Sequence, residues 1–141
     1  WAESEIVAPF LKGLPALFNF DIAKGIIESI NDEDASELIQ KHIDIQKTYK
    51  AVQPNFVDAI FTTNHDQNRV YNQLNKSTAK AKLAASILLS LPGIPYLYYG
   101  EEIGMEGKEE FIEAGGTEFY AVPCINDNDD WVDVLANWIN K

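Results

Sequence analysis

Cysteine is almost missing from this chain of 141 residues, in which Cys124 is the only one. A single thiol cannot form an internal disulfide or a CxxC metal site, and an iron–sulfur cluster needs four ligands. We therefore interpret Cys124 as a small buried apolar side chain. His65 and Asp66 could form half of a metal site, but no other His or Cys lies near them in the sequence. We expect no metal and no cofactor.

Basic residues are scarce as well, with 11 Lys and Arg against 22 Asp and Glu and a net charge of −11. Nucleic acids and anionic membranes are polyanions, so this balance argues against both as partners. No apolar run approaches the roughly 20 residues that a membrane span needs. We expect a soluble protein whose compartment is left open, since one free cysteine fits oxidising and reducing surroundings alike.

The composition is that of a globular domain, with 46% apolar and 23% charged residues. The chain begins with Trp1 and not Met, so it is either processed, excised from something longer or engineered. Its charge is uneven: residues 1–105 hold 13 acidic and 9 basic side chains, and residues 106–141 hold 9 and 2. Such a step can mark a boundary between segments, or simply one solvated acidic face.

Short strands and helices alternate along the chain. Strand-like runs lie at 16–20, 57–62, 96–99 and 118–122, and helical patterns at 4–11, 22–30, 34–49, 79–90 and 109–114, with a last helix after Asp130. Ser4, Asp34 and Ser77 are the expected N-caps of three of these helices. The helix at 79–90 is apolar on nearly every side, so we expect it to be well buried. The alternation predicts a parallel α/β fold with its ligand site after the strands.

A polar cluster follows the second strand-like run, at Asn64, His65, Asp66 and Arg69. These side chains can bind a polyhydroxylated or an anionic ligand. The alternative is a turn in which Asn64 and Asp66 form local hydrogen bonds to the backbone.

The segment 59–70 resembles the fourth conserved region of the alpha-amylase clan of glycoside hydrolases, Phe-x-x-Asn-His-Asp, with matches at Phe61, Asn64, His65 and Asp66. Residues 88–105 resemble the eighth-strand region of that family, and residues 1–3 the end of its third region. The resemblance covers residues 1–106 and implies a partial (β/α) barrel of about three strand–helix units.

The resemblance also implies roles for the residues of the cluster. Asp66 would be the family's third carboxylate, which stabilises the transition state, and His65 would hydrogen-bond sugar hydroxyls. Asn64 and Arg69 would support the substrate-binding loop. The implied ligand is an α-glucan or maltooligosaccharide. Glu101 and Glu102 also match the family and are interpreted as a structural end to the last strand.

Two of the family's three catalytic carboxylates have no match. The nucleophile belongs to the absent second region, and the acid/base Glu would stand just before Trp1. Retaining glycoside hydrolysis needs both, so we do not expect hydrolysis by this chain alone. The alternatives are part of an active α-glucan hydrolase, completed by a precursor or partner chain, and a maltooligosaccharide-binding module without catalysis.

The tail resembles a second family. Residues 109–138, with Glu-Ala-Gly-Gly at 113–116, Pro-Cys-Ile-Asn at 123–126 and Trp131, are similar to the C-terminal end of bacterial ferrochelatases. That family's catalytic His and Glu lie upstream of the matched part, so no chelatase activity is implied. We expect a chimera of bacterial origin, with residues 1–106 amylase-like and 107–141 a ferrochelatase-like strand–helix unit packed into the same domain. An open sheet edge would favour a homo-oligomer.

Overall fold

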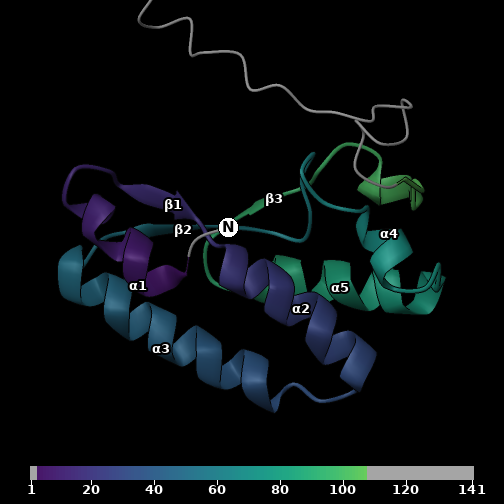
Figure 1. Cartoon of the computed structure of the whole chain (residues 1–141), viewed down its shortest axis with the longest axis horizontal. Helices are drawn as coiled ribbons and strands as arrows, with labels where there is room; N and C mark the ends of the chain where they lie inside the picture. The colour runs from purple at the N-terminus through teal and green to yellow at the C-terminus, as the bar shows by residue number, and fades with distance from the viewer. Residues whose placement is uncertain (1–2, 108–141) are drawn as a thin grey trace, which may run out of the picture.

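A computed structural model describes residues 3–107 of the chain (Figure 1). The elements expected at 109–114, at 118–122 and after Asp130, and the environment of Cys124, lie outside the described residues. The helices are α1 (Ser4–Val7), η1 (Ala8–Lys12), α2 (Phe20–Asp32), α3 (Ser36–Val52), α4 (Val70–Gln73), α5 (Thr78–Ser90) and η2 (Glu101–Ile103).

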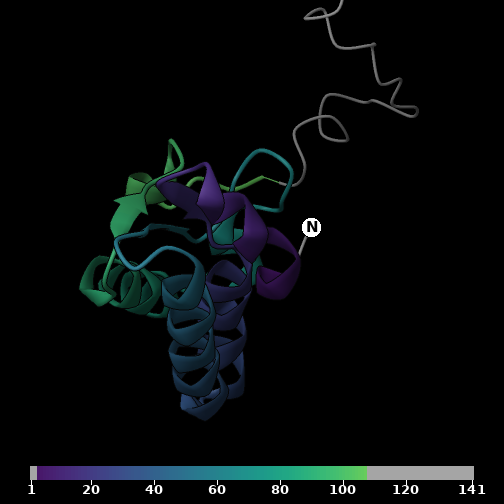
Figure 2. The ribbon, with the colours of Figure 1, turned by 90° about the vertical axis from the view of Figure 1, so that its left-hand side faces the viewer.

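Three parallel strands form one sheet in the order β1-β2-β3, from β1 (Ala16–Phe18), β2 (Val57–Phe61) and β3 (Ile94–Tyr96). Helices α2 and α3 connect β1 to β2, and α5 leads to β3. Figures 1 and 2 show these helices on one face of the sheet. This is the arrangement of successive strand–helix units that the alternating sequence pattern predicts.

The two faces of the sheet differ in what covers them. Successive side chains of a strand point to opposite faces. Ile60 of β2 lies on the face that the helices cover and belongs to the buried cluster there. Phe61 lies on the opposite face and contacts the ring of Phe18. On this second face the side chains of Phe18, Ile94 and Tyr96 are each about half exposed, at 52%, 52% and 46%. The helix-free face of the sheet is therefore apolar and open within the described part of the chain.

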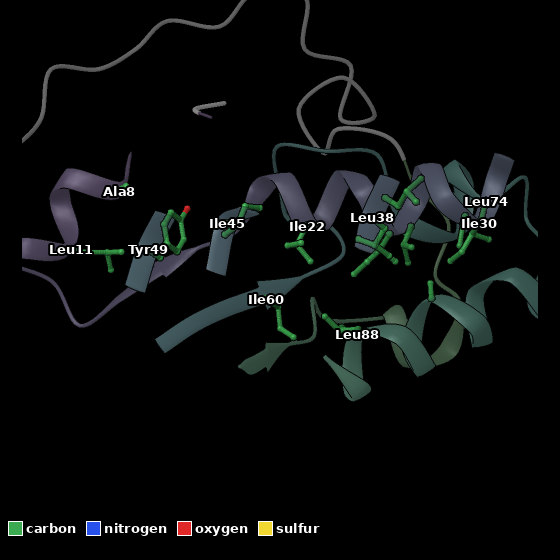
Figure 3. Close-up of a cluster of buried hydrophobic side chains, with 14 residues drawn as sticks. Ala8, Leu11, Ile22, Ile30, Leu38, Ile45, Tyr49, Ile60, Leu74 and Leu88 are labelled. Atoms are coloured by element: carbon green, nitrogen blue, oxygen red, sulfur yellow. The ribbon is translucent and has the colours of Figure 1, made fainter. Parts of the chain in front are cut away.

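The hydrophobic core lies between the sheet and the helices (Figure 3). Leu11, Ile22, Ile26, Leu74 and Leu88 are all fully buried in it. Burying such a side chain stabilises the fold by about 1.5–3 kcal/mol each. Within residues 3–107, no helix is long and apolar enough to cross a membrane.

The expected N-caps are confirmed at one helix and corrected at two. The Ser77 side chain accepts from the Lys80 amide at the start of α5. Asp34 lies one position before the Ala35 cap of α3 and accepts from the Ser36 amide instead. The Ser4 cap is wrong, because the Ser4 hydroxyl and amide both donate to the Asp21 carboxylate. A tertiary contact has replaced the local one.

Two further expectations need correction. The last described strand lies at Ile94–Tyr96 and not at 96–99, because β2 ends at Phe61, opposite Tyr96, and provides no partner beyond it. Helix α5 is less buried than its composition predicts: Ala84 and Leu88 are buried, but Leu89 is 61% exposed. Among the described elements, α5 packs on one side only, mainly against α2.

Gly93 fixes the entry into β3. Its φ of +139° is unfavourable for a residue with a side chain, and an added Cβ would lie 2.4 Å from the backbone oxygen of Asp58. Contact that close is impossible without moving a strand, so only glycine allows β3 to pass β2 at this point.

Candidate functional site

The candidate site is a hollow of about 400 Å³ at the carboxyl ends of the three strands. In parallel α/β folds this end of the sheet is where ligands bind. Each strand contributes to the lining through the residues that end or follow it. The lining residues are Phe18, Phe20, Phe61, Thr63, Asn64, His65, Asp66, Tyr96, Leu97 and Tyr98.

Asn64 shapes the loop that follows β2. Its side-chain oxygen accepts from the backbone amide of Asp66 at 3.0 Å, and its carbonyl accepts from Gln67 at 3.2 Å. This is the Asx turn considered as the local interpretation of the sequence. The turn and the ligand site are therefore compatible, since the same turn brings His65 and Asp66 to the rim of the hollow.

His65 and Asp66 are the most exposed polar groups of the lining. Their side chains are 71% and 74% exposed, and His65 Nε2 lies 3.4 Å from Asp66 Oδ1. Both side chains keep nearly all of their hydrogen-bonding capacity for a ligand. Among the described residues that line the hollow, Asp66 is the only carboxylic acid.

Arg69 does not line the hollow. The side chain is 5% exposed, and its guanidinium lies 4.2 Å from the ring centroids of Tyr98 and Tyr99. Its Nη1 donates to the carbonyl of Tyr99, and its backbone amide donates to Gly107. The structure thus places Arg69 against Tyr98 and Tyr99, in the segment that follows β3.

Glu101 contacts both this segment and the residues that follow β2. Its carboxylate accepts from the hydroxyls of Thr62 and Thr63, at 2.8 and 2.6 Å, and from the backbone amide of Tyr98 at 3.2 Å. Glu102 is exposed. Neither residue lines the hollow. Their interpretation as the end of the strand is wrong in position, because β3 ends at Tyr96 and both residues lie in η2.

The aromatic part of the lining was not predicted. Phe18 packs edge-on against Tyr96, with ring centroids 4.9 Å apart, and Phe20 packs edge-on against Phe61 at 5.0 Å. A sequence signal did exist, because each of the three described strands ends in an aromatic residue, Phe18, Phe61 or Tyr96. The side-by-side order of the strands, which the sequence does not contain, turns those separate residues into one surface.

No group of three or more His, Cys, Asp or Glu side chains within residues 3–107 is arranged to hold a metal ion. The polar side-chain groups of the lining are one imidazole, one carboxylate, one amide and the hydroxyls of Thr63, Tyr96 and Tyr98. Such groups hydrogen-bond hydroxyls, while the aromatic rings offer apolar faces beside them.

Comparison with known proteins gives one family over most of the chain. The model of the alpha-amylase catalytic domain matches residues 9–132. Alpha-amylase SusG of Bacteroides thetaiotaomicron is 36% identical over 88% of this chain and 17% of its own length. Alpha-amylase 3 of Dictyoglomus thermophilum is 41% identical over 79% of this chain and 23% of its own. The chain thus spans about a fifth of these relatives.

Solved structures agree. The alpha-amylase from H. orenii superimposes with a TM-score of 0.73 and 44% identity, over 77% of this chain and 23% of that one. A cyclic alpha-maltosyl-(1→6)-maltose hydrolase from Arthrobacter globiformis, solved in complex with maltose, gives 0.66 and 25% over 73% and 24%. The expected partial (β/α) barrel of amylase type is confirmed for the described residues.

A second similarity covers a shorter stretch. The ferrochelatase of Pseudomonas putida is 58% identical over 41 residues, 29% of this chain and 12% of the enzyme. This confirms the predicted resemblance to both families. The SusG and ferrochelatase matches together exceed the length of the chain, so they overlap.

Proposed function

Because this chain belongs to the family of alpha-amylase catalytic domains, we propose that its hollow forms one side of an α-glucan site. The site binds maltooligosaccharides without hydrolysing them. The observation that carries the proposal is the pairing of an exposed His65 and Asp66 with an aromatic floor at the carboxyl ends of the strands. Asp66 corresponds to the family's transition-state-stabilising carboxylate, and in this chain Asp66 and His65 bind sugar hydroxyls.

The chemistry of the lining supports sugar binding. A sugar presents hydroxyls at its edge and C–H groups on its faces. The His65 and Asp66 side chains provide donors and acceptors at the rim, and Tyr96 and Phe18 provide apolar surface beside them. Asn64 acts through the turn that presents Asp66, and Arg69 acts through Tyr98 and Tyr99.

The lack of a second acid supports binding without turnover. Retaining hydrolysis needs two carboxyl groups about 5–5.5 Å apart, one as nucleophile and one as acid/base. Of the described residues that line the hollow, Asp66 alone carries a carboxyl group. Asp66 can stabilise positive charge on a sugar ring, but it cannot be both nucleophile and proton donor.

A second candidate function is a share in an active α-glucan hydrolase whose other carboxylates come from a longer precursor or a partner chain. The open apolar face of the sheet, with Phe18, Ile94 and Tyr96 half exposed, favours this candidate. In such an assembly the same hollow would face the additional strands.

The division of the chain at residue 107 is also part of the proposal. The step in charge between residues 1–105 and 106–141 supports it, whereas the match to the amylase model crosses this boundary and runs to residue 132. The named relatives are bacterial, and we propose the same origin for this chain.

The test is a titration of the ¹⁵N-labelled chain with maltotriose, followed by proton–nitrogen correlation spectra. We expect selective shifts at residues 64–66. Asp66→Asn should weaken binding about tenfold, because a hydrogen bond to a charged group contributes about 1.5–3 kcal/mol. Asp32→Asn, an exposed acid at the end of α2, is the matched control and should leave binding unchanged.

A starch-degradation assay on the same sample separates the candidates. Binding without product supports the proposal. Product formation by the purified chain would overturn it in favour of a complete hydrolase. Dispersed spectra that maltotriose leaves unchanged would show that the hollow binds no such sugar.

A further inference from the structure

We infer that Glu101 is a positioning residue for the candidate sugar site. Its carboxylate holds the two walls of the hollow, residues 63–66 and residues 96–98, in a fixed position relative to each other. The inference rests on the proposed function for its meaning. It concerns a residue that does not itself line the hollow and is therefore not a ligand-binding group.

The two walls come from different strands. Thr63, Asn64, His65 and Asp66 follow β2, and the wall at 96–98 ends and follows β3. The ladder between β2 and β3 ends with the pair Phe61 and Tyr96. Beyond that pair no sheet hydrogen bond holds one wall to the other within the described residues.

Glu101 provides this missing connection. One carboxylate oxygen accepts from the hydroxyls of Thr62 and Thr63, and the other accepts from the Tyr98 amide at 3.2 Å. Both threonines are 2% exposed, so water does not compete for their hydroxyls. Thr63 precedes Asn64 directly, so its anchoring sets where the Asx turn starts and where Asp66 is presented.

Within residues 3–107, the groups that donate to the Glu101 carboxylate are all neutral. Among residues 3–107 its carboxylate forms no ion pair, and its partners are two hydroxyls and one amide. Hydrogen bonds to an ionised acceptor are shorter and stronger than neutral ones, and three of them converge here. An ordinary strand end needs no such group, but a site that must hold two loops in one geometry does.

Arg69 holds the wall at residues 96–98 through contacts that are separate from those of Glu101. It contacts Tyr98 and Tyr99 and donates to Gly107. Because these contacts do not involve Glu101, they keep the wall attached when Glu101 is replaced. Replacement of Glu101 should therefore loosen the geometry of the site without unfolding the chain.

The test compares Glu101→Leu, which removes all three hydrogen bonds, with Glu101→Gln. The Gln oxygen can accept from the Tyr98 amide while its NH₂ group donates to the hydroxyl oxygens of Thr62 and Thr63. Two readouts are made on the full chain: the affinity for maltotriose, and millisecond exchange broadening of the amide signals of residues 63–66 and 96–98. Ser77→Ala removes the cap of α5 at a residue that does not line the hollow, and it controls for a general loss of stability.

We expect Glu101→Leu to weaken maltotriose binding about tenfold and to broaden the signals of both walls. Glu101→Gln should stay within about twofold and keep sharp signals, and Ser77→Ala should change neither readout. Thr62→Val and Thr63→Val, which keep side-chain shape and remove one donor each, give the same two readouts should Glu101→Leu not fold.

Sharp wall signals and unchanged affinity in Glu101→Leu would overturn the inference, as would equal losses in the Leu and Gln variants. The broadening readout needs no sugar. It therefore decides the positioning role even if the wild-type chain binds no maltotriose, an outcome that would count against the proposed function alone.

Discussion

Asn19 donates its side-chain amide to both carboxylate oxygens of Asp58, at 3.0 Å each, while its own oxygen accepts from the first turn of α2 at Ile22. One buried side chain thus connects the end of β1, the start of α2 and the second residue of β2. Gln46 of α3 adds a third donor to Asp58 at 3.3 Å. The predictions for stability start from this network.

The buried carboxylate should make stability depend on pH. Burial raises the pKa of Asp58 to about 6, against the opposing effect of the hydrogen bonds from Asn19 and Gln46. Between pH 4 and 6 the folded chain therefore holds a proton that the unfolded chain has released. The contribution of Asp58 is fully present below pH 4 and is lost as the pH rises to 6.

Urea unfolding of the wild type and Asp58→Asn at several pH values measures this effect. The difference in free energy of unfolding between the two should change by on the order of 2 kcal/mol across pH 4–6.5, to the disadvantage of the wild type at the higher pH. A difference that is constant over this range would contradict the prediction.

Asn19→Ala should destabilise the chain more than the loss of an ordinary helix cap. The variant loses the cap of α2 and two donors to a buried carboxylate. We expect a loss of about 3 kcal/mol by chemical denaturation. Ser77→Ala removes only the cap of α5 and should cost about 1 kcal/mol. Equal losses in the two variants would show that Asp58 finds other partners.

Two neighbouring leucines of α5 test which side of the helix is packed. Leu88 is fully buried and Leu89 is 61% exposed. Leu88→Ala should lower the free energy of unfolding by about 3 kcal/mol, and Leu89→Ala by less than about 0.5 kcal/mol. A large loss for Leu89→Ala would mean that a part of the chain outside residues 3–107, or another copy, covers it.

The open face of the sheet should drive self-association. β1 and β3 are edge strands within the described sheet, and unpaired edges with apolar side chains invite contact with other chains. We expect the mass measured by light scattering to rise with concentration, and Ile94→Lys to reduce that rise. Ile39→Lys, on the exposed side of α3, is the control. A clean monomer at high concentration would contradict the prediction.

Local sequence patterns predicted many of the helices and strands, because residues that are near in sequence determine where such elements form. The spacing of apolar residues predicted α2, α3 and α5, and β-branched residues predicted β2. The failures have tertiary causes. Ser4 bonds to Asp21 and not to its own helix, and the exposure of α5 depends on which elements lie beside it.

The candidate site also has one part that the sequence could predict and one part that it could not. The Asn64-His65-Asp66 loop is one continuous motif, so the sequence could place it after a strand. The contact of Glu101 with Thr62 joins residues about forty positions apart, and the ring contact of Phe18 with Tyr96 joins residues about eighty positions apart. Only the parallel order of the strands brings them together, and no local pattern contains that order.

The parallel sheet also sets how fast this chain can fold. The pairs Ala16 with Val57 and Ala59 with Ile94 each join positions about forty residues apart. Such distant partners form slowly, because the chain between them must be ordered before the contact stabilises anything. Helices α2 and α3 are close in sequence and can pack first, so the sheet and the hollow at its end should be the last parts to form.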